Sequence, residues 1–236
     1  MKTKAWQAKL KQISFRWPKL ALVLFSLLAL LFFANQSQSV ENKSKAVVAS
    51  CFDGDTVKLA DRRVVRITGI DAPEVVHDNA PEPFYAQKAR DELFALLGGK
   101  KVTLKTTSVT PRDRFGRLLA DLILEDGQSI AELMVKRGAA YFFPHKELAP
   151  DFQERLLLLQ REAITARVGL WELLLEDSVA RESYVGNRDS LRFVPANCPQ
   201  AQLIKPRNRV YFGTLMDAFM AGFAPARICP FWPKAR

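Results

Sequence analysis

Three short polar segments, spaced along the chain, contain the residue types that could bind a cation and a phosphate at one place. They cover residues 53–56, 66–74 and 113–117. Together they supply carboxylates, which hard divalent cations prefer as ligands, and arginines, whose planar guanidinium groups match phosphate oxygens. A bound divalent cation lowers the pKa of nearby water and offsets the repulsion between an anionic nucleophile and a phosphodiester. This combination predicts the hydrolysis of phosphodiester bonds.

Each segment on its own also has an ordinary structural explanation. The Asp-Gly pair at residues 53–54 is typical of a hairpin turn. Arg66 could be a solvated charge on an edge strand, and Arg117 a hydrated side chain after a turn. The occurrence of all the segments in this order is what favours a site.

The sequence around these segments predicts a fold that would hold them. Short runs of alternating apolar residues predict five strands, at about residues 47–48, 57–59, 65–67, 101–106 and 117–124. Helical spacing and end signals predict three helices, at about residues 83–97, 130–137 and 151–167. Strands and helices in this order predict an α+β protein with an OB-type five-stranded β-barrel and about three helices.

The three polar segments, together with Gly-Leu-Trp at residues 169–171, resemble the staphylococcal nuclease (thermonuclease) family. The resemblance covers about residues 47–172 with consistent gaps, and it implies a nuclease domain at residues 46–172. It implies an enzyme, a calcium-dependent nuclease that hydrolyses DNA and RNA with low sequence specificity. It also implies a monomer with no obligate protein partner.

The resemblance implies a role for five side chains. Asp55 and Asp71 would be ligands of Ca²⁺. Arg66 and Arg117 would bind the phosphate and stabilise the extra charge of the transition state. Glu74 would orient or deprotonate the attacking water.

The chain departs from the family pattern at three places near the expected site. Ala72 replaces a common threonine, but its main-chain carbonyl can still serve as the third calcium ligand from the protein. Arg114 and Phe115 stand where Lys and Tyr are usual, so their substrate contacts would differ. Tyr141 lies in a segment that is shorter than in relatives, and its ring could either stack on a nucleotide base or pack in the core.

The N-terminus is typical of an export segment. Residues 20–34 are apolar except for Ser26, and they follow six basic residues. As a helix they would span roughly 22 Å, which is shorter than the ~30 Å hydrocarbon core of a bilayer. We therefore expect residues 1–39 to form a hydrophobic helix that is either a signal peptide or a membrane anchor. Either interpretation places the rest of the chain outside the cytoplasm, in the periplasm, secreted or tethered to the membrane.

The C-terminal residues 173–236 form a basic, aromatic extension. Residues 181–236 contain nine Lys and Arg against three acidic residues, whereas residues 40–180 contain 20 against 22. The net charge of +10 is thus concentrated at the two ends of the chain. A short helix is expected near residues 215–223. The extension could contact nucleic acid or anionic lipid, or it could simply pack against the rest of the protein.

The three cysteines suit an oxidising compartment. Cys198 and Cys229 could close a disulfide loop, which would leave Cys51 over. Two other functions stay open at this point. One is a catalytically inactive OB module that binds nucleic acid or protein, and the other is a membrane-tethered interaction protein that acts through its C-terminal extension.

Overall fold

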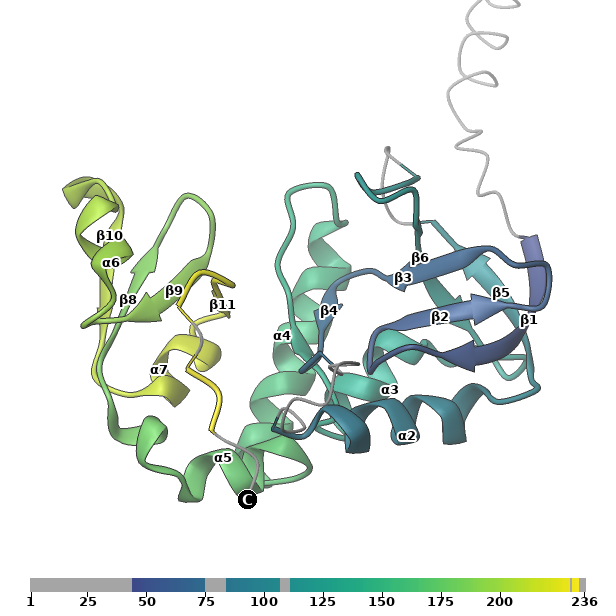
Figure 1. Ribbon diagram of the computed structural model, residues 1–236, viewed down its shortest axis with the longest axis horizontal. Helices are drawn as coiled ribbons and strands as arrows, with labels where there is room; N and C mark the ends of the chain where they lie inside the picture. The colour runs from purple at the N-terminus through teal and green to yellow at the C-terminus, as the bar shows by residue number, and fades with distance from the viewer. Residues whose placement is uncertain (1–43, 75–83, 107–110, 230, 234–236) are drawn as a thin grey trace, which may run out of the picture. The chain divides into compact units, whose positions relative to one another are not determined.

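The computed structural model describes residues 44–74, 84–106, 111–229 and 231–233 (Figure 1). The predicted hydrophobic helix of the export segment lies outside these residues. Within the described ranges, no helix combines the length and the hydrophobicity needed to cross a bilayer.

Five strands close into a barrel in the order β1-β2-β3-β6-β5, as predicted. Their bounds are Ser44–Cys51 (β1), Thr56–Leu59 (β2), Val64–Ile67 (β3), Lys101–Lys105 (β5) and Leu118–Ile123 (β6). All neighbouring pairs are antiparallel except β3 and β6, which run parallel. Inward-facing residues such as Val57, Val65 and Leu122 are completely buried. The alternation that predicted the strands is therefore the alternation of a barrel wall.

Helices α2 (Ala86–Leu97), α3 (Ile130–Lys136) and α4 (Pro150–Thr165) pack on the core of the barrel. Helix α5 (Leu170–Glu176) follows and packs against α4. The first three match the predicted helices. Helix α4 begins at Pro150, and proline suits the first helical turn because the N–H that it lacks has no partner within the helix there. Helix α5 was not predicted, and it continues to Glu176 because Leu170, Trp171 and Leu174 are buried on one face.

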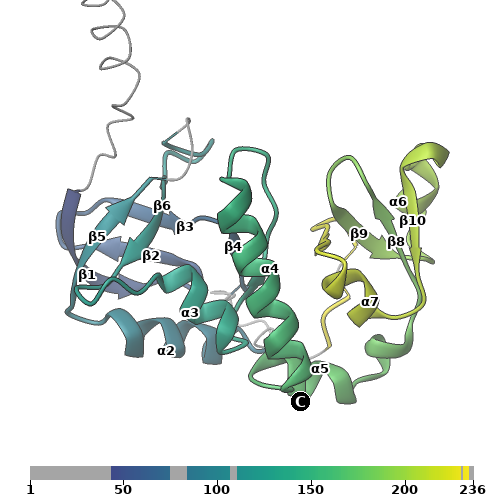
Figure 2. The same cartoon turned by 180° about the vertical axis from the view of Figure 1, so that it is seen from behind.

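The C-terminal residues form a second, smaller sheet, where the sequence predicted only one short helix. The strands lie in the order β10-β8-β9-β11. The elements are η1 (Ser178–Arg181), β8 (Tyr184–Asn187), β9 (Arg192–Pro195), α6 (Pro199–Leu203), η2 (Pro206–Asn208), β10 (Arg209–Phe212), α7 (Leu215–Met220) and β11 (Ala224–Pro225). Helix α7 is the predicted one. Both ribbon views place α4 between the barrel and this sheet (Figures 1 and 2).

The two largest of three apolar cores in the described residues stabilise these regions. The first fills the barrel, and the second is an aromatic cluster that joins Tyr141 and Trp171 to Tyr184, Phe193 and Phe219. The second core joins helices α4 and α5 to the C-terminal sheet. The C-terminal region is therefore packed against the rest of the fold.

Polar groups also link the two regions. The buried Gln160 of α4 donates a hydrogen bond to the carbonyl of Phe219 at 2.8 Å and accepts one from the N–H of Phe142 at 2.7 Å. A disulfide joins Cys198 to Cys229, and Cys51 is a free thiol. The cysteine pairing considered from the sequence is thus present.

Candidate active site

The loop between β1 and β2 places Asp55 inside the protein, with 1% of its surface exposed. Its N–H donates to Asp53 Oδ1 at 2.9 Å, which closes the turn that the Asp-Gly pair predicted. Gly54 is needed here for space, because a Cβ atom would lie 2.7 Å from the Cβ atoms of Ala72 and Ala89. The loop is therefore pressed against the segment that carries the other acids.

Arg66 is the centre of the site, and it is buried instead of being a solvated edge charge. Its Nη2 lies 2.9 Å from Asp55 Oδ2 and 2.5 Å from Asp71 Oδ1. Its Nη1 donates to the carbonyls of Ile67 and Ile70, at 2.8 and 2.9 Å. One guanidinium thus joins the two acids that the sequence predicted as metal ligands, and the backbone fixes its orientation.

Asp71 lies on the short strand β4 (Ile70–Asp71), which pairs with β7 (Tyr141–Phe142). The hydroxyl of Tyr141 donates to Asp71 Oδ2 at 2.6 Å, and only 2% of this tyrosine is exposed. Of the two interpretations of Tyr141, the structure has the one in which its ring packs in the core. The N–H of Ala72 donates to Asp55 Oδ2 at 3.0 Å. The backbone of residue 72 is therefore adjacent to both carboxylates.

Glu74 lies at the outer edge of this cluster, with 53% of its side chain exposed. Its Oε1 is 3.0 Å from Nη2 of Arg227, and the same nitrogen is 3.0 Å from Asp71 Oδ1. Sequence reasoning did not find Arg227, which comes from the C-terminal region. The only sequence signal was an arginine two residues before a cysteine in a basic segment.

Arg117 approaches the cluster from the other side. Its Nε lies 2.7 Å from Asp113 Oδ2, and its Nη1 lies 3.5 Å from Thr56 Oγ1. The same hydroxyl donates to Asp55 Oδ1 at 2.8 Å. A single hydroxyl therefore separates this guanidinium from the buried acids.

The predicted substrate contacts in the loop before Arg117 are at the surface. Phe115 is 66% exposed. The guanidinium carbons of Arg114 and Arg117 lie 4.7 and 5.4 Å from its ring centroid. An exposed ring next to two cations could stack on a base while the arginines contact phosphates.

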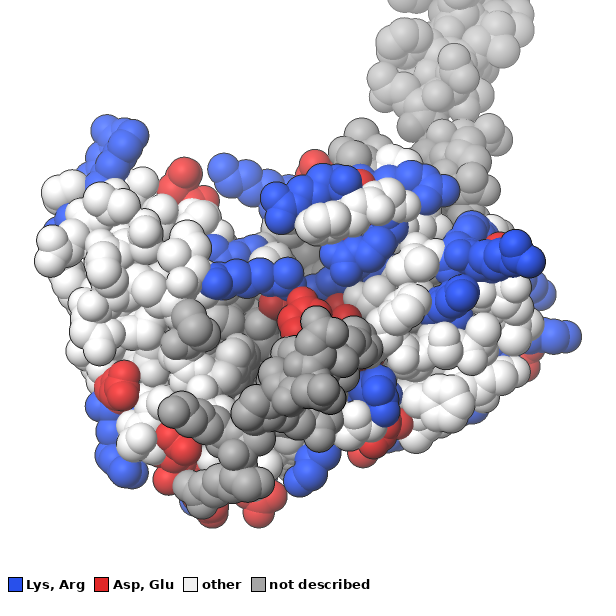
Figure 3. Space-filling model, viewed as in Figure 1, with Lys and Arg blue, Asp and Glu red and all other residues white. Residues whose placement is uncertain are grey.

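The charges in the cluster are strongly coupled. Burial raises the pKa of Asp55 well above its usual range, although Arg66 opposes this effect. Burial also raises the pKa of Glu74, with a further contribution from Asp53. For Arg66, the attraction of Asp55 and Asp71 outweighs burial and raises the pKa of the guanidinium. Figure 3 shows Lys and Arg side chains beside a small group of acidic side chains on this face of the molecule.

The donor chemistry fits a hard cation. Two carboxylate oxygens, from Asp55 and Asp71, converge on one nitrogen of Arg66, and so they lie near enough to share a cation. Among the described residues, no group of three or more His, Cys, Asp or Glu side chains is arranged to hold a metal. Among the described residues, the carbonyl of Ala72 is adjacent to both carboxylates and could supply a further ligand beside water.

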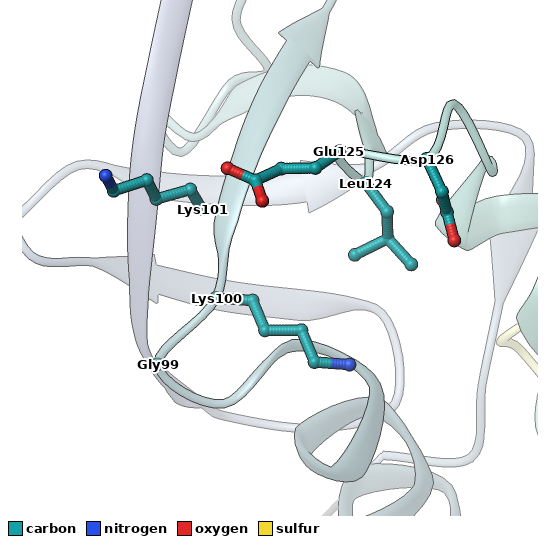
Figure 4. Close-up of a pocket in the computed structure, with 6 residues that line it drawn as sticks. All are labelled: Gly99, Lys100, Lys101, Leu124, Glu125 and Asp126. Carbon is teal, nitrogen blue, oxygen red and sulfur yellow. The ribbon is translucent and has the colours of Figure 1, made fainter.

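A surface pocket elsewhere on the barrel contains none of the predicted site residues. It is lined by Gly99, Lys100, Lys101, Leu124, Glu125 and Asp126 (Figure 4). Its lysines lie in the turn after α2 and at the start of β5, and its carboxylates follow β6.

Comparisons with known proteins agree with this geometry. The family model described as "Staphylococcal nuclease homologue" matches residues 64–173. A protein of Escherichia coli O157:H7 named "Uncharacterized endonuclease" is 34% identical over 127 residues, covering 52% of this chain and 74% of that protein. "Endonuclease YhcR" of Bacillus subtilis is 30% identical over 220 residues, covering 81% of this chain but 17% of that protein. "Thermonuclease" of Staphylococcus hyicus is 29% identical over 145 residues, covering 59% of this chain and 82% of that protein.

Proposed function

The chain belongs to the staphylococcal nuclease family and is a nuclease, and from this membership we propose that it is a calcium-dependent enzyme that cuts both DNA and RNA. The observation that carries the proposal is the contact of Arg66 with both Asp55 and Asp71. Burying two acids and an arginine at one point costs free energy even when they are paired. Such clusters are concentrated at functional sites, and a module that only binds its partner could keep these groups at the surface.

Asp55, Asp71 and the carbonyl of Ala72 would hold the Ca²⁺ ion. When bound, the ion would lower the pKa of an adjacent water and offset the negative charge of the phosphodiester. The hydrogen bonds of Tyr141 and Thr56 to the two carboxylates would hold those groups in their orientation.

Arg66, Arg117 and Glu74 would act on the substrate. Arg66 contacts one oxygen of Asp55, and Arg117 is linked to the other oxygen through the hydroxyl of Thr56. The two guanidiniums would bind oxygens of one phosphate and stabilise the charge that develops on it. Glu74 is partly exposed at the rim, where a carboxylate could orient a water for attack or accept its proton. Arg114 and Phe115 would contact the neighbouring nucleotides.

We also propose that the enzyme acts outside the cytoplasm. The support is the basic segment followed by the apolar residues 20–34, together with a disulfide between Cys198 and Cys229. Whether the segment is removed or retained as an anchor can be read from the mass of the protein in membrane and soluble fractions.

The test of the activity uses the purified full chain in detergent with single-stranded DNA and RNA. We expect cleavage when calcium is present and none when it is chelated. The variant Asp55→Asn is the control for contaminating nucleases, because it keeps the size of the side chain but loses its charge. If the wild type binds DNA but does not cut it with calcium, the chain is instead an inactive OB module.

A further inference from the structure

We propose that Arg227 is a third phosphate-binding arginine of the nuclease site, supplied by the C-terminal region. This inference rests on the proposed nuclease function. Arg227 lies outside residues 64–173, which the family model matches. It therefore adds a substrate contact that the matched segment does not contain.

The first argument is its position. Nη2 of Arg227 lies 3.0 Å from both Asp71 Oδ1 and Glu74 Oε1, so it reaches the acid that contacts Arg66 and the acid proposed to orient the water. At the same time 61% of the Arg227 side chain is exposed. The guanidinium of Arg227 therefore contacts the acids of the site and is also accessible to solvent. A residue that binds the phosphate of a substrate needs both properties.

The second argument is that the backbone around Arg227 is fixed on both sides. Just before it, β11 pairs in parallel with β9, and the N–H of Ala226 donates to the carbonyl of Phe193 at 2.8 Å. Two residues after it, Cys229 is bonded to Cys198. Because residues 226 and 229 are both fixed, the backbone of Arg227 can adopt few positions. Such preorganisation lowers the entropy cost of binding.

The third argument is electrostatic. A polyanion that approaches the site must come close to buried acids, and added positive charge lowers this repulsion. The C-terminal sheet supplies a second cation that interacts electrostatically with Asp71, namely Arg192. Arg192 donates to the carbonyl of Pro144 at 3.0 Å and stacks 3.6 Å from the ring centroid of Phe143. The C-terminal region thus contributes positive charge near the acids.

The same contacts could in principle have the reverse effect. Arg227 covers Asp71 and Glu74, and an arginine that stayed there would inhibit the enzyme. The two roles predict opposite results for Arg227→Ala, because loss of a phosphate contact weakens substrate binding whereas loss of an inhibitor raises activity.

The experiment compares the full chain with Arg227→Ala, Arg227→Lys and the control Arg207→Ala. Arg207 is an exposed arginine of η2, so its removal makes the same change in charge away from the acids. Binding of a fluorescent single-stranded DNA is measured with calcium chelated, and KM and kcat are measured with calcium present. We expect Arg227→Ala to weaken binding and raise KM about tenfold, since a charge-assisted hydrogen bond to phosphate is lost.

A salt titration separates a phosphate contact from a structural effect. Loss of one phosphate contact to a single strand should reduce the slope of log K against log salt by about 0.7, and Lys at this position should restore most of the slope. Equal binding and slope in Arg227→Ala and Arg207→Ala would overturn the proposal, and so would higher activity in Arg227→Ala. If the wild type cuts no substrate with calcium, the nuclease function itself fails, which is a distinct outcome.

The disulfide gives a second measurement. Reduction of the wild type should raise KM toward the value of Arg227→Ala, while the same treatment should change the KM of Arg227→Ala little, because the two changes remove one interaction. If reduction leaves the KM of the wild type unchanged although the disulfide is shown to be open, the proposed anchoring of Arg227 is wrong.

Discussion

The barrel and the C-terminal region are built by different means, and both place charged groups at the same acids. The barrel is held by a closed ring of backbone hydrogen bonds and an aliphatic core. The C-terminal region has a small sheet of strands with two to four residues, and its packing is mainly aromatic. A disulfide stabilises the smaller region, which is common where a core is limited. In the functions proposed above, the barrel supplies the catalytic side chains and the C-terminal region supplies a further contact with the substrate phosphate.

The largest expected effects concern the two arginines of the barrel. Arg117→Ala should lower the rate of hydrolysis by at least ~100-fold with little loss of stability, because Arg117 is partly exposed and its ion pair is with Asp113 of the adjacent turn. Arg66→Ala should lower the rate similarly and also destabilise the fold by about 3–5 kcal/mol, because it removes the buried guanidinium that pairs with both Asp55 and Asp71. Single-turnover kinetics and urea unfolding measure the two effects.

The variants Arg66→Ala and Arg117→Ala serve as controls for each other. If Arg66→Ala were as stable as Arg117→Ala, the cluster would not be a buried ion network. Turnover equal to the wild type in Arg117→Ala would remove this arginine from the mechanism, whatever its effect on stability.

Removal of the disulfide should affect the C-terminal region more than the barrel. In the chain-entropy model, loss of a cross-link between residues 31 apart costs about 3–4 kcal/mol. We expect Cys198→Ser with Cys229→Ser to speed hydrogen exchange in β8, β9 and β10, with little change in β1, β2 and β3. Equal acceleration in both regions would show that they unfold as one unit.

The sequence predicted more of the barrel than of the C-terminal region, and the reason is physical. In the barrel, alternating burial leaves a period of two that is visible in the chain, and the site residues lie on neighbouring segments. In the C-terminal region the strands are too short to show a period, and their packing depends on aromatic contacts with α4 and α5. Arg227 and Asp71 are 156 residues apart, and no local pattern reports such a contact. Helix α5 was missed because it crosses residue 172, where the nuclease domain was expected to end and the extension to begin.

A buried carboxylate of the barrel should make stability depend on pH. Burial raises the pKa of Asp121 to about 6, despite hydrogen bonds from Ser129, Ala131 and Leu122. Because the folded state binds this proton more tightly than the unfolded state, the stabilisation is fully present below about pH 4 and is lost as pH rises through about 6. A shift of this size corresponds to about 3 kcal/mol.

The variant Asp121→Asn isolates this contribution. Urea unfolding of the wild type and the variant at several pH values between 4 and 7 should show a slope in the wild type that the variant lacks. Identical slopes in both proteins would assign the pH dependence to other groups, such as the acids of the active site.

The smallest expected effects come from two glycines, one in each region, at which an added methyl group meets different neighbours. At Gly54 the new Cβ would lie 2.7 Å from the methyl groups of Ala72 and Ala89, which cannot rotate away. At Gly186 it would lie 2.7 and 2.8 Å from the ring edges of Phe223 and Phe212, which can tilt. We expect Gly54→Ala to cost about 2–3 kcal/mol and Gly186→Ala about 1–2 kcal/mol, measured by urea unfolding.

The nuclease activities of Gly54→Ala and Gly186→Ala should differ more than their free energies of unfolding. Gly54 adjoins Asp55, so the backbone shift that relieves the clash moves a predicted calcium ligand, whereas Gly186 lies in β8 away from the acids. Gly54→Ala should therefore raise the calcium concentration needed for half-maximal cleavage, and Gly186→Ala should leave it unchanged. If both variants lost activity in proportion to stability alone, the close packing of the loop against residue 72 would matter for folding and not for the geometry of the site.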